Sequence, residues 1–157
     1  MNTSMSKEET QQLISKHASV VRFGSPADAV KDEWIAKAEA ELNRPFPDSY
    51  KWFLKKYVGG EIGGEEIYSL YGMPFESVNG GDIVFQHLAN RKAGLMDDTK
   101  LVISETDFGE VFFFDCTQYI AGEYGIFLRI PSGEIIFYAK NFYEYLYKRV
   151  AVHLSGS

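Results

Sequence analysis

The feature that most constrains the fold is a run of four strand-like segments, separated by short turns, in the second half of the chain. Apolar and aromatic side chains dominate these segments, which are Leu101–Glu105, Val111–Cys116, Gly125–Ile130 and Glu134–Tyr138. Turn-forming residues, among them Gly109, Gly122 and Gly133, connect them. Because a parallel connection needs about a dozen residues or more, these short connections predict an antiparallel sheet.

Helical patterns precede and follow the predicted strands. Three longer helices are predicted at Ser25–Leu42, Asp48–Tyr57 and Asn141–Val150, and two shorter ones at Glu8–Lys16 and Asp82–Arg91. Trp34 is expected in the core, as is an aromatic-rich stripe of the second helix, formed by Tyr50, Phe53, Leu54 and Tyr57. Asp82 is a candidate cap of the helix predicted at Asp82–Arg91. Ser25 and Pro26 supply a cap and a first-turn proline, and Gly59 is expected to take the left-handed position after the second helix. Further extended segments are predicted at residues 20–24 and 65–71. The order of elements predicts an α+β domain, an antiparallel meander packed by N-terminal helices and a C-terminal helix.

The size and composition predict one globular domain. The chain has 157 residues, of which 45% are hydrophobic and 15% aromatic, enough to build a core. We expect a single domain. Residues 1–24 form a helix and an extended segment of it, residues 25–150 form its main part, and residues 151–157 form a frayed tail. The single cysteine, Cys116, is expected to be buried and excludes an internal disulfide. The lack of a disulfide, the polar N-terminus and the absence of an apolar run about 20 residues long together predict a cytoplasmic location.

Negative charge is concentrated in the middle of the chain. Residues 59–116 contain eleven acidic and three basic side chains, a net charge of −8 against −6 for the whole chain. A field of this sign repels nucleic acid and anionic lipid and attracts a basic protein partner. The alternative interpretation is a solvated acidic surface without a specific role.

Motifs that would indicate catalysis or a cofactor fail in their context. The glycine cluster at residues 59–64 follows a predicted helix and lies among acids, which disfavours phosphate binding and favours a turn. Residues 107–109 spell the Asp-Phe-Gly of kinases without the other kinase motifs, so a hairpin turn is expected. The histidines lack metal-ligand spacing, and His87 is expected to be structural. We therefore expect no catalytic residue, no cofactor, no metal and no nucleic-acid partner, although an acid pair such as Glu105 and Asp115 keeps an enzyme as an alternative.

Three sequence blocks resemble the SUKH superfamily, which includes the Smi/Knr-type regulators of fungal cell-wall synthesis and many bacterial immunity proteins. The first combines Ile35, Glu39 and Leu42 with the stretch 46–54 (Phe-Pro-Asp-Ser-Tyr-Lys-Trp-Phe-Leu) and the pair Gly59-Gly60. The second is the stretch 101–115, a strand, an Asp-Phe-Gly turn and an aromatic strand ending in Asp. The third is the closing helix at 141–146. The similarity spans about Ser25 to Val150, with Phe46 where the family pattern has leucine.

The resemblance implies a non-catalytic domain that binds another protein. Bacterial members of this kind neutralise a secreted toxin, often a nuclease, by binding it in the producing cell. Our first hypothesis is therefore an immunity protein whose acidic segment binds a basic toxin domain. The alternatives are a regulatory or scaffold interaction module of the Smi/Knr type, and a small-ligand binder or enzyme. Acids in predicted loops or strand ends and two tyrosines are the candidate partner-binding residues: Glu61, Glu65, Glu66, Tyr68, Tyr71, Asp97, Asp98, Asp107 and Glu110.

Overall fold

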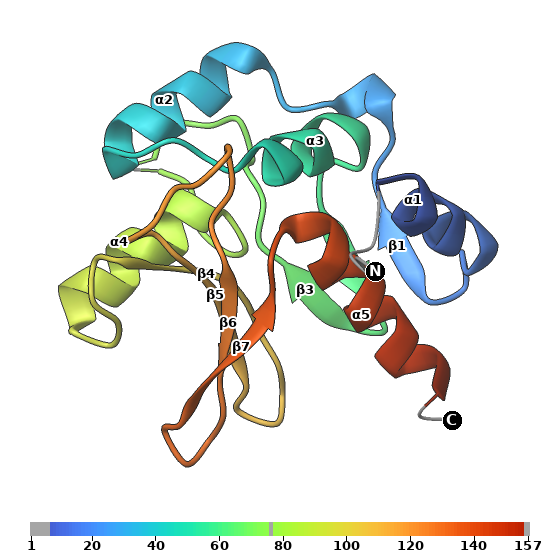
Figure 1. Cartoon of the computed structure of the whole chain (residues 1–157). Coiled ribbons are helices and arrows are strands. Elements are labelled where there is room, and N and C mark those ends of the chain that lie inside the picture. Colours follow the sequence, from blue (N-terminus) through green and yellow to red (C-terminus); the bar gives the residue numbers. More distant parts are fainter. Residues whose placement is uncertain (1–6, 76, 156–157) are drawn as a thin grey trace.

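The structure is a computed structural model that describes residues 7–75 and 77–155. Within them, the helices are α1 (Lys7–Lys16), a 3-10 turn η1 (Pro26–Asp28), α2 (Asp32–Leu42), α3 (Asp48–Lys56), α4 (Ile83–Ala93) and α5 (Phe142–Ser155). The strands are β1 (Val21–Phe23), β2 (Gly60–Ile62), β3 (Glu65–Ile67), β4 (Lys100–Glu105), β5 (Val111–Asp115), β6 (Ile126–Arg129) and β7 (Ile135–Ala139). In Figure 1, α2 and α3 lie above the strands, α4 lies at one side and α5 at the other.

The predicted antiparallel sheet is confirmed. Strands β4, β5, β6 and β7 pair in sequence order, and every pairing is antiparallel. Phe113 of β5 lies opposite Val102 on one side and Phe127 on the other. The fold class is therefore α+β, as the short connections predict.

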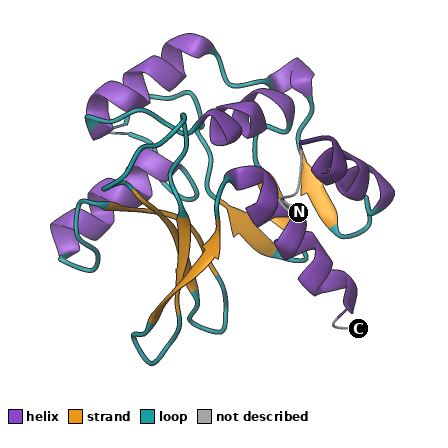
Figure 2. Ribbon diagram, viewed as in Figure 1, coloured by secondary structure: helices purple, strands orange, loops and turns teal. Residues whose placement is uncertain are grey.

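A second sheet of three strands, β1, β2 and β3, was not predicted as such. Its pairs are antiparallel, and they place Arg22, Glu61 and Glu66 in one row across the three strands. The amide of Tyr68 donates to the carbonyl of Ile103 at 2.9 Å, which joins the end of β3 to β4. Figure 2 shows the two groups of strands beside each other, with α5 in front of them. The two sheets are therefore joined where the end of β3 meets β4.

The core lies between the larger sheet and helices α3 and α5. Phe53 and Leu54 of the aromatic stripe are fully buried, as predicted, while Trp34 and Tyr57 are only partly buried. The ring of Tyr50 contacts the rings of Phe114 and Phe142 at centroid distances of 5.5 and 5.1 Å. These contacts fix the two helices to β5 and stabilise the whole domain.

The helix predicted over Ser25–Leu42 is wrong in its first third. Residues 26–28 form only a 3-10 turn, Ser25 makes no side-chain cap, and α2 begins at Asp32. The physical reason lies in Val30, which is buried and whose amide donates to the carbonyl of Leu54 at 3.3 Å. That bond to α3 holds the chain extended between η1 and α2.

Smaller differences concern where elements end. Val58, with φ of 69°, takes the left-handed position expected of Gly59. Gly60 begins β2, and Gly63 and Gly64 form the turn between β2 and β3, so a turn is present in the glycine cluster as predicted. The helix α5 continues to Ser155, so residues 151–155 of the predicted tail are helical. The segment predicted as a strand over 65–71 is a regular strand only over Glu65–Ile67, followed by an isolated bridge between Ser69 and Asp82. Residues 156–157 of that tail, residues 1–6 and Glu76 lie outside the described residues.

Two predictions about single side chains are resolved by burial. His87 is buried and its Nε2 lies 2.9 Å from Asp98 Oδ1, which confirms a structural histidine. Cys116 is partly buried against the core, and burial raises the pKa of its thiol. A thiol with a raised pKa is a poor nucleophile at neutral pH, so this cysteine gives no support to covalent catalysis.

Candidate functional site

A groove of about 640 Å³ lies between η1, the start of α2 and strands β2 and β3. Its floor is formed by backbone and small side chains near Gly24, Gly59 and Ser69. Polar and aromatic side chains form its rim: Asp28, Lys31, Trp34, Glu66 and Tyr71. Two of the predicted binding residues, Glu66 and Tyr71, therefore meet at this groove.

Glycine is required for the backbone to close around the groove. Gly60 has φ of +139°, and a Cβ atom there would lie 1.9 Å from the carbonyl oxygen of Arg22. Only a residue without a side chain allows β1 and β2 to approach so closely. The glycine pair that resembles the family motif is thus an architectural feature that shapes the groove floor.

Glu66 and Tyr71 are held in place by a second glycine. The hydroxyl of Tyr71 accepts a hydrogen bond from the amide of Gly81 at 2.7 Å and lies 3.4 Å from Glu66 Oε2. A Cβ atom at Gly81 would lie 1.9 Å from that same Glu66 oxygen. Burial and the Glu66 carboxylate raise the pKa of the Tyr71 hydroxyl, so it is neutral in the physiological range. The pair offers a partner an exposed ring beside a carboxylate.

Asp82 fixes the other side of Tyr71. Its fully buried carboxylate caps α4 by accepting from the amides of Val84 and Phe85, and its second oxygen accepts from the amide of Tyr71 at 3.0 Å. The predicted cap at Asp82 is confirmed. Because one side chain ties the helix start to the rim segment, Tyr71 is presented on a rigid support.

Glu61 lies beside Glu66 rather than in a loop. Strand pairing places it directly between Arg22 and Glu66, on the face of the three-stranded sheet that carries their exposed side chains. Arg22 offsets part of this negative charge. The two glutamates thus extend the acidic rim along the sheet.

Glu65, another predicted binding residue, lies away from the groove rim in an ion pair with α5. Its side chain is only 12% exposed and forms an ion pair with Arg149 of α5, which is 7% exposed. Arg149 Nε donates to Glu65 Oε1 at 3.0 Å, Arg149 Nη2 donates to Glu65 Oε2, and His153 Nε2 lies 2.9 Å from that second oxygen. Burial alone would lower the pKa of Arg149, but hydrogen bonds to Glu65 and Tyr138 raise it above its ordinary value. Glu65 is therefore a structural link between β3 and α5.

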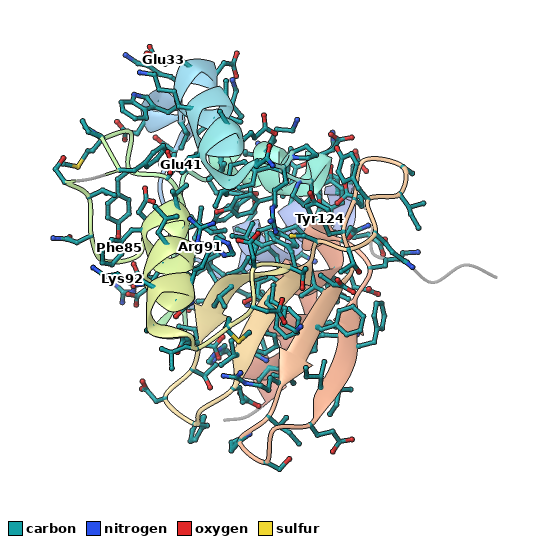
Figure 3. All side chains as sticks on the ribbon, turned by 90° about the vertical axis from the view of Figure 1, so that its left-hand side faces the viewer. Glu33, Glu41, Phe85, Arg91, Lys92 and Tyr124 are labelled. Carbon is teal, nitrogen blue, oxygen red and sulfur yellow. The ribbon has the colours of Figure 1, made fainter. Side chains whose placement is uncertain are left out.

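Asp98 has a half-exposed carboxylate that forms ion pairs within the chain. Its backbone carbonyl accepts from Arg44 Nη1 at 2.6 Å, and its carboxylate contacts Arg44, His87 and Arg91 at 2.8, 2.9 and 3.2 Å. Figure 3 shows Arg91 on α4, beside Lys92. This loop residue joins α4 to the connection between α2 and α3, and its charge is neutralised within the chain.

The contacts of Asp98 predict how the free energy of unfolding depends on pH. The hydrogen bond with His87, opposed by some desolvation and aided by the charge of Arg44, lowers the pKa of Asp98. A carboxyl whose folded-state pKa is lowered stabilises the fold above its unfolded pKa of about 4 and loses this effect as the pH falls through the folded value. Asp98→Asn should therefore reduce the free energy of unfolding by about 1 kcal/mol at pH 7, with a smaller difference from wild type at pH 3. Urea unfolding at the two pH values measures it, with the exposed turn residue Asp107→Asn as control; an equal difference at both pH values would contradict the prediction.

The remaining candidates lie elsewhere. Asp97 is exposed in the α4–β4 loop, where hydrogen bonds from Lys100 and Thr99 lower its pKa to about 2. Asp107 and Glu110 lie at the β4–β5 turn, which confirms the predicted hairpin. Tyr68 is buried, and its carbonyl accepts the hydroxyl of Tyr50 at 2.7 Å, so its ring belongs to the core. The candidates are thus distributed over three surfaces, and two of them, Glu65 and Tyr68, are internal.

The sequence interpretation missed the rim residues contributed by η1 and α2. Trp34 was assigned to the core, yet it is partly exposed at the groove and its ring contacts Phe75 at 5.9 Å. Its position at the start of α2 gave one signal, because a large aromatic residue beside charged neighbours is frequent at protein interfaces. Asp28 and Lys31 gave none, since isolated charges are common on any surface.

The described residues, 7–75 and 77–155, contain no group of three or more His, Cys, Asp or Glu side chains arranged to hold a metal ion. No helix within these ranges has the length and apolar character needed to cross a bilayer.

The fold and the groove define a small α+β domain of the Smi/Knr type. The family described as SUKH_6, SMI1-KNR4 cell-wall, matches residues 32–146, and the chain belongs to this family. Domains of this superfamily are generally non-catalytic protein-binding modules, and many are immunity proteins. No curated protein matches the chain.

Residues of the first family-like block have structural roles in this chain. Glu39 Oε2 accepts the amide of Phe46 at 2.7 Å, which fixes the turn before α3. Phe46, Tyr50, Phe53 and Leu54 are fully buried. The block accounts for the fold, and recognition has to reside in the exposed residues around it.

Proposed function

We propose that this chain is an immunity protein that neutralises a toxin in the cytoplasm by binding it directly through the groove, with no catalytic step. The observation that carries the proposal is the pairing of exposed Tyr71 with the Glu66 carboxylate at the rim of the groove. Membership of a family of protein-binding domains supports binding as the activity. The acidic middle of the chain supports a basic toxin domain as the partner.

The groove residues can act as a recognition surface because they are rigid before binding. Tyr71 is fixed through Asp82 and Gly81, so little conformational entropy is lost when a partner packs on the ring. A lysine or arginine of the toxin placed on this ring meets the Glu66 carboxylate at the same time, which combines a cation–π contact with an ion pair. Asp28 lines the same groove, and Glu61 lies opposite Glu66 on the neighbouring strand, so both add negative charge near this pair.

A protection assay tests the proposed function. The toxin domain encoded beside the gene for this chain would be expressed in a sensitive bacterial host, with and without the chain, and survival counted. We expect growth only when the chain is present and a stable complex when the two purified proteins are mixed. A neighbouring gene without a toxin domain, or a toxin whose effect is unchanged by the chain, would contradict the proposal and favour a regulatory module.

The same assay locates the binding surface. Glu66→Lys with Tyr71→Ala should weaken the complex by at least about 100-fold, because a central aromatic anchor and its charge partner are lost. Glu8→Lys, an equal charge change on an exposed residue of α1, should change the affinity less than about threefold. Binding kinetics at 0.1 M and 1 M salt should also show slower association at high salt for the wild type and Glu8→Lys, and a weaker salt dependence for the Glu66→Lys, Tyr71→Ala variant. Equal affinities of the two variants would place the recognition surface elsewhere.

A further inference from the structure

Strand β7 is an apolar strand at the free edge of the larger sheet. It follows β6 at the end of the strand order, and no strand of the described chain lies on its other side. Ile135, Ile136 and Phe137 are 46%, 42% and 56% exposed. Edge strands are normally protected by charges or proline, and residues 135–139 contain neither. An edge of this composition is suited to pairing with another strand.

The backbone groups available for pairing follow from the β6–β7 register. The amide of Ile130 donates to the carbonyl of Glu134 at 3.0 Å, so the backbone of Glu134 faces β6. Hydrogen-bonded positions alternate along an antiparallel pair, so Ile136, opposite Leu128, also faces β6. Ile135 and Phe137 then direct their N–H and C=O groups away from the sheet. The register irregularity of β7 lies beyond Phe137 and leaves these groups undisturbed.

We propose that β7 pairs with β7 of a second copy of this chain, antiparallel, with the two-fold axis at Ile136. This register places Ile135 opposite Phe137 of the second copy at two symmetric positions, so that all the outward N–H and C=O groups of residues 135 and 137 form hydrogen bonds. The two Ile136 side chains meet at the axis. On one face of the joined sheet Ile135 packs against Phe137 of the second copy, and on the other face the two Ile136 side chains pack against each other. The two four-stranded sheets then form one continuous sheet.

Charge complementarity supports a second copy as the occupant. In the proposed register, Glu134 lies opposite Tyr138 of the second copy, and both belong to the face that carries α5. Lys148 of α5 donates to the carbonyl of Tyr138 at 2.6 Å, and its ammonium lies 5.0 Å from the Tyr138 ring centroid. Glu134 of each copy is therefore brought beside Lys148 of the other. The symmetry forms this ion pair twice, which an unrelated strand would not do.

The oligomeric state of the full chain tests the proposal. Light scattering after size exclusion should show a dimer for the wild type, with dissociation on dilution. Ile136→Lys places two ammonium groups opposite each other at the axis and should raise the dimer Kd at least about tenfold. Val152→Lys, the same change on an exposed apolar residue of α5, should leave the Kd unchanged. Hydrogen exchange at the amides of Ile135 and Phe137 should slow with protein concentration in the wild type and in Val152→Lys, but much less in Ile136→Lys.

A charge exchange tests the register independently of the apolar residues. Glu134→Lys and Lys148→Glu should each weaken the dimer, and the two together should restore it, because the cross-copy pair is re-formed with opposite polarity. Circular dichroism confirms that each variant is folded. A wild type that stays monomeric at millimolar concentration, a dimer unaffected by Ile136→Lys, or a double variant no better than its parents would overturn the proposal.

Discussion

Replacing Phe53 with alanine should lower the free energy of unfolding by about 3–5 kcal/mol, a large share of the stability of an ordinary domain. The ring is fully buried and contacts Phe142 of α5 and Phe23 of β1 at centroid distances of 5.0 and 5.2 Å. Its removal leaves a cavity where α3 joins both other elements, because the packed rings around it cannot close the space. Urea unfolding followed by circular dichroism measures the loss.

Phe108→Ala is the matched control for this prediction. The Phe108 ring is 83% exposed in the β4–β5 turn, so its removal should change the free energy of unfolding by less than about 0.5 kcal/mol. The two variants remove the same atoms from a buried and an exposed place. Equal losses of stability would mean that Phe53 does not hold α3 against the core.

The elements that the sequence predicts well are those whose signal is local. Connections of three to eight residues between the predicted apolar segments are enough to predict the antiparallel order of β4 to β7. The cap at Asp82 needs only the amides that directly follow it. Phe53 and Leu54 are found because helical spacing alone places them on one face.

The elements that could not be predicted depend on contacts between distant parts of the chain. The start of α3 is capped by Glu123, whose carboxylate accepts from the amide and hydroxyl of Ser49 at 3.0 and 2.6 Å, across 74 positions of the sequence. The break before α2 depends on the bond between Val30 and Leu54. Strand β2 contains a glycine with positive φ, a composition that favours turns unless β1 and β3 lie on both sides.

At the candidate site, too, local sequence predicts some properties of single charged residues, while others depend on distant parts of the chain. Alternation along β3 predicts that Glu65 and Glu66 point to opposite faces, but nothing local indicates which face is covered. Only α5, which is more than 70 residues further along the chain, supplies Arg149 and buries Glu65. Glu66 remains on the surface at the groove. A charge count over residues 59–116 therefore overestimates the acidity available to a partner.

These neighbouring glutamates give the second large prediction. Glu65→Ala should lower the free energy of unfolding by about 3–5 kcal/mol, because it leaves the Arg149 cation buried without its carboxylate. Glu66→Ala, one residue away on the exposed face, should change it by less than about 0.5 kcal/mol. The effect of Glu65→Ala should persist in 1 M salt, since buried charges are poorly screened.

A third variant separates the charge from the packing. The double substitution of Glu65→Leu with Arg149→Met removes both charges and keeps most of the buried volume, so it should be clearly more stable than Glu65→Ala. The Met side chain can still lie over the Phe112 ring, where the guanidinium carbon of Arg149 now lies 4.6 Å from the centroid. If the double variant were as unstable as Glu65→Ala, the loss would come from packing or from the hydrogen bond to Tyr138. If all the Glu65 variants matched wild type, β3 and α5 would not depend on this ion pair, and Glu65 would return to the set of residues free to meet a partner.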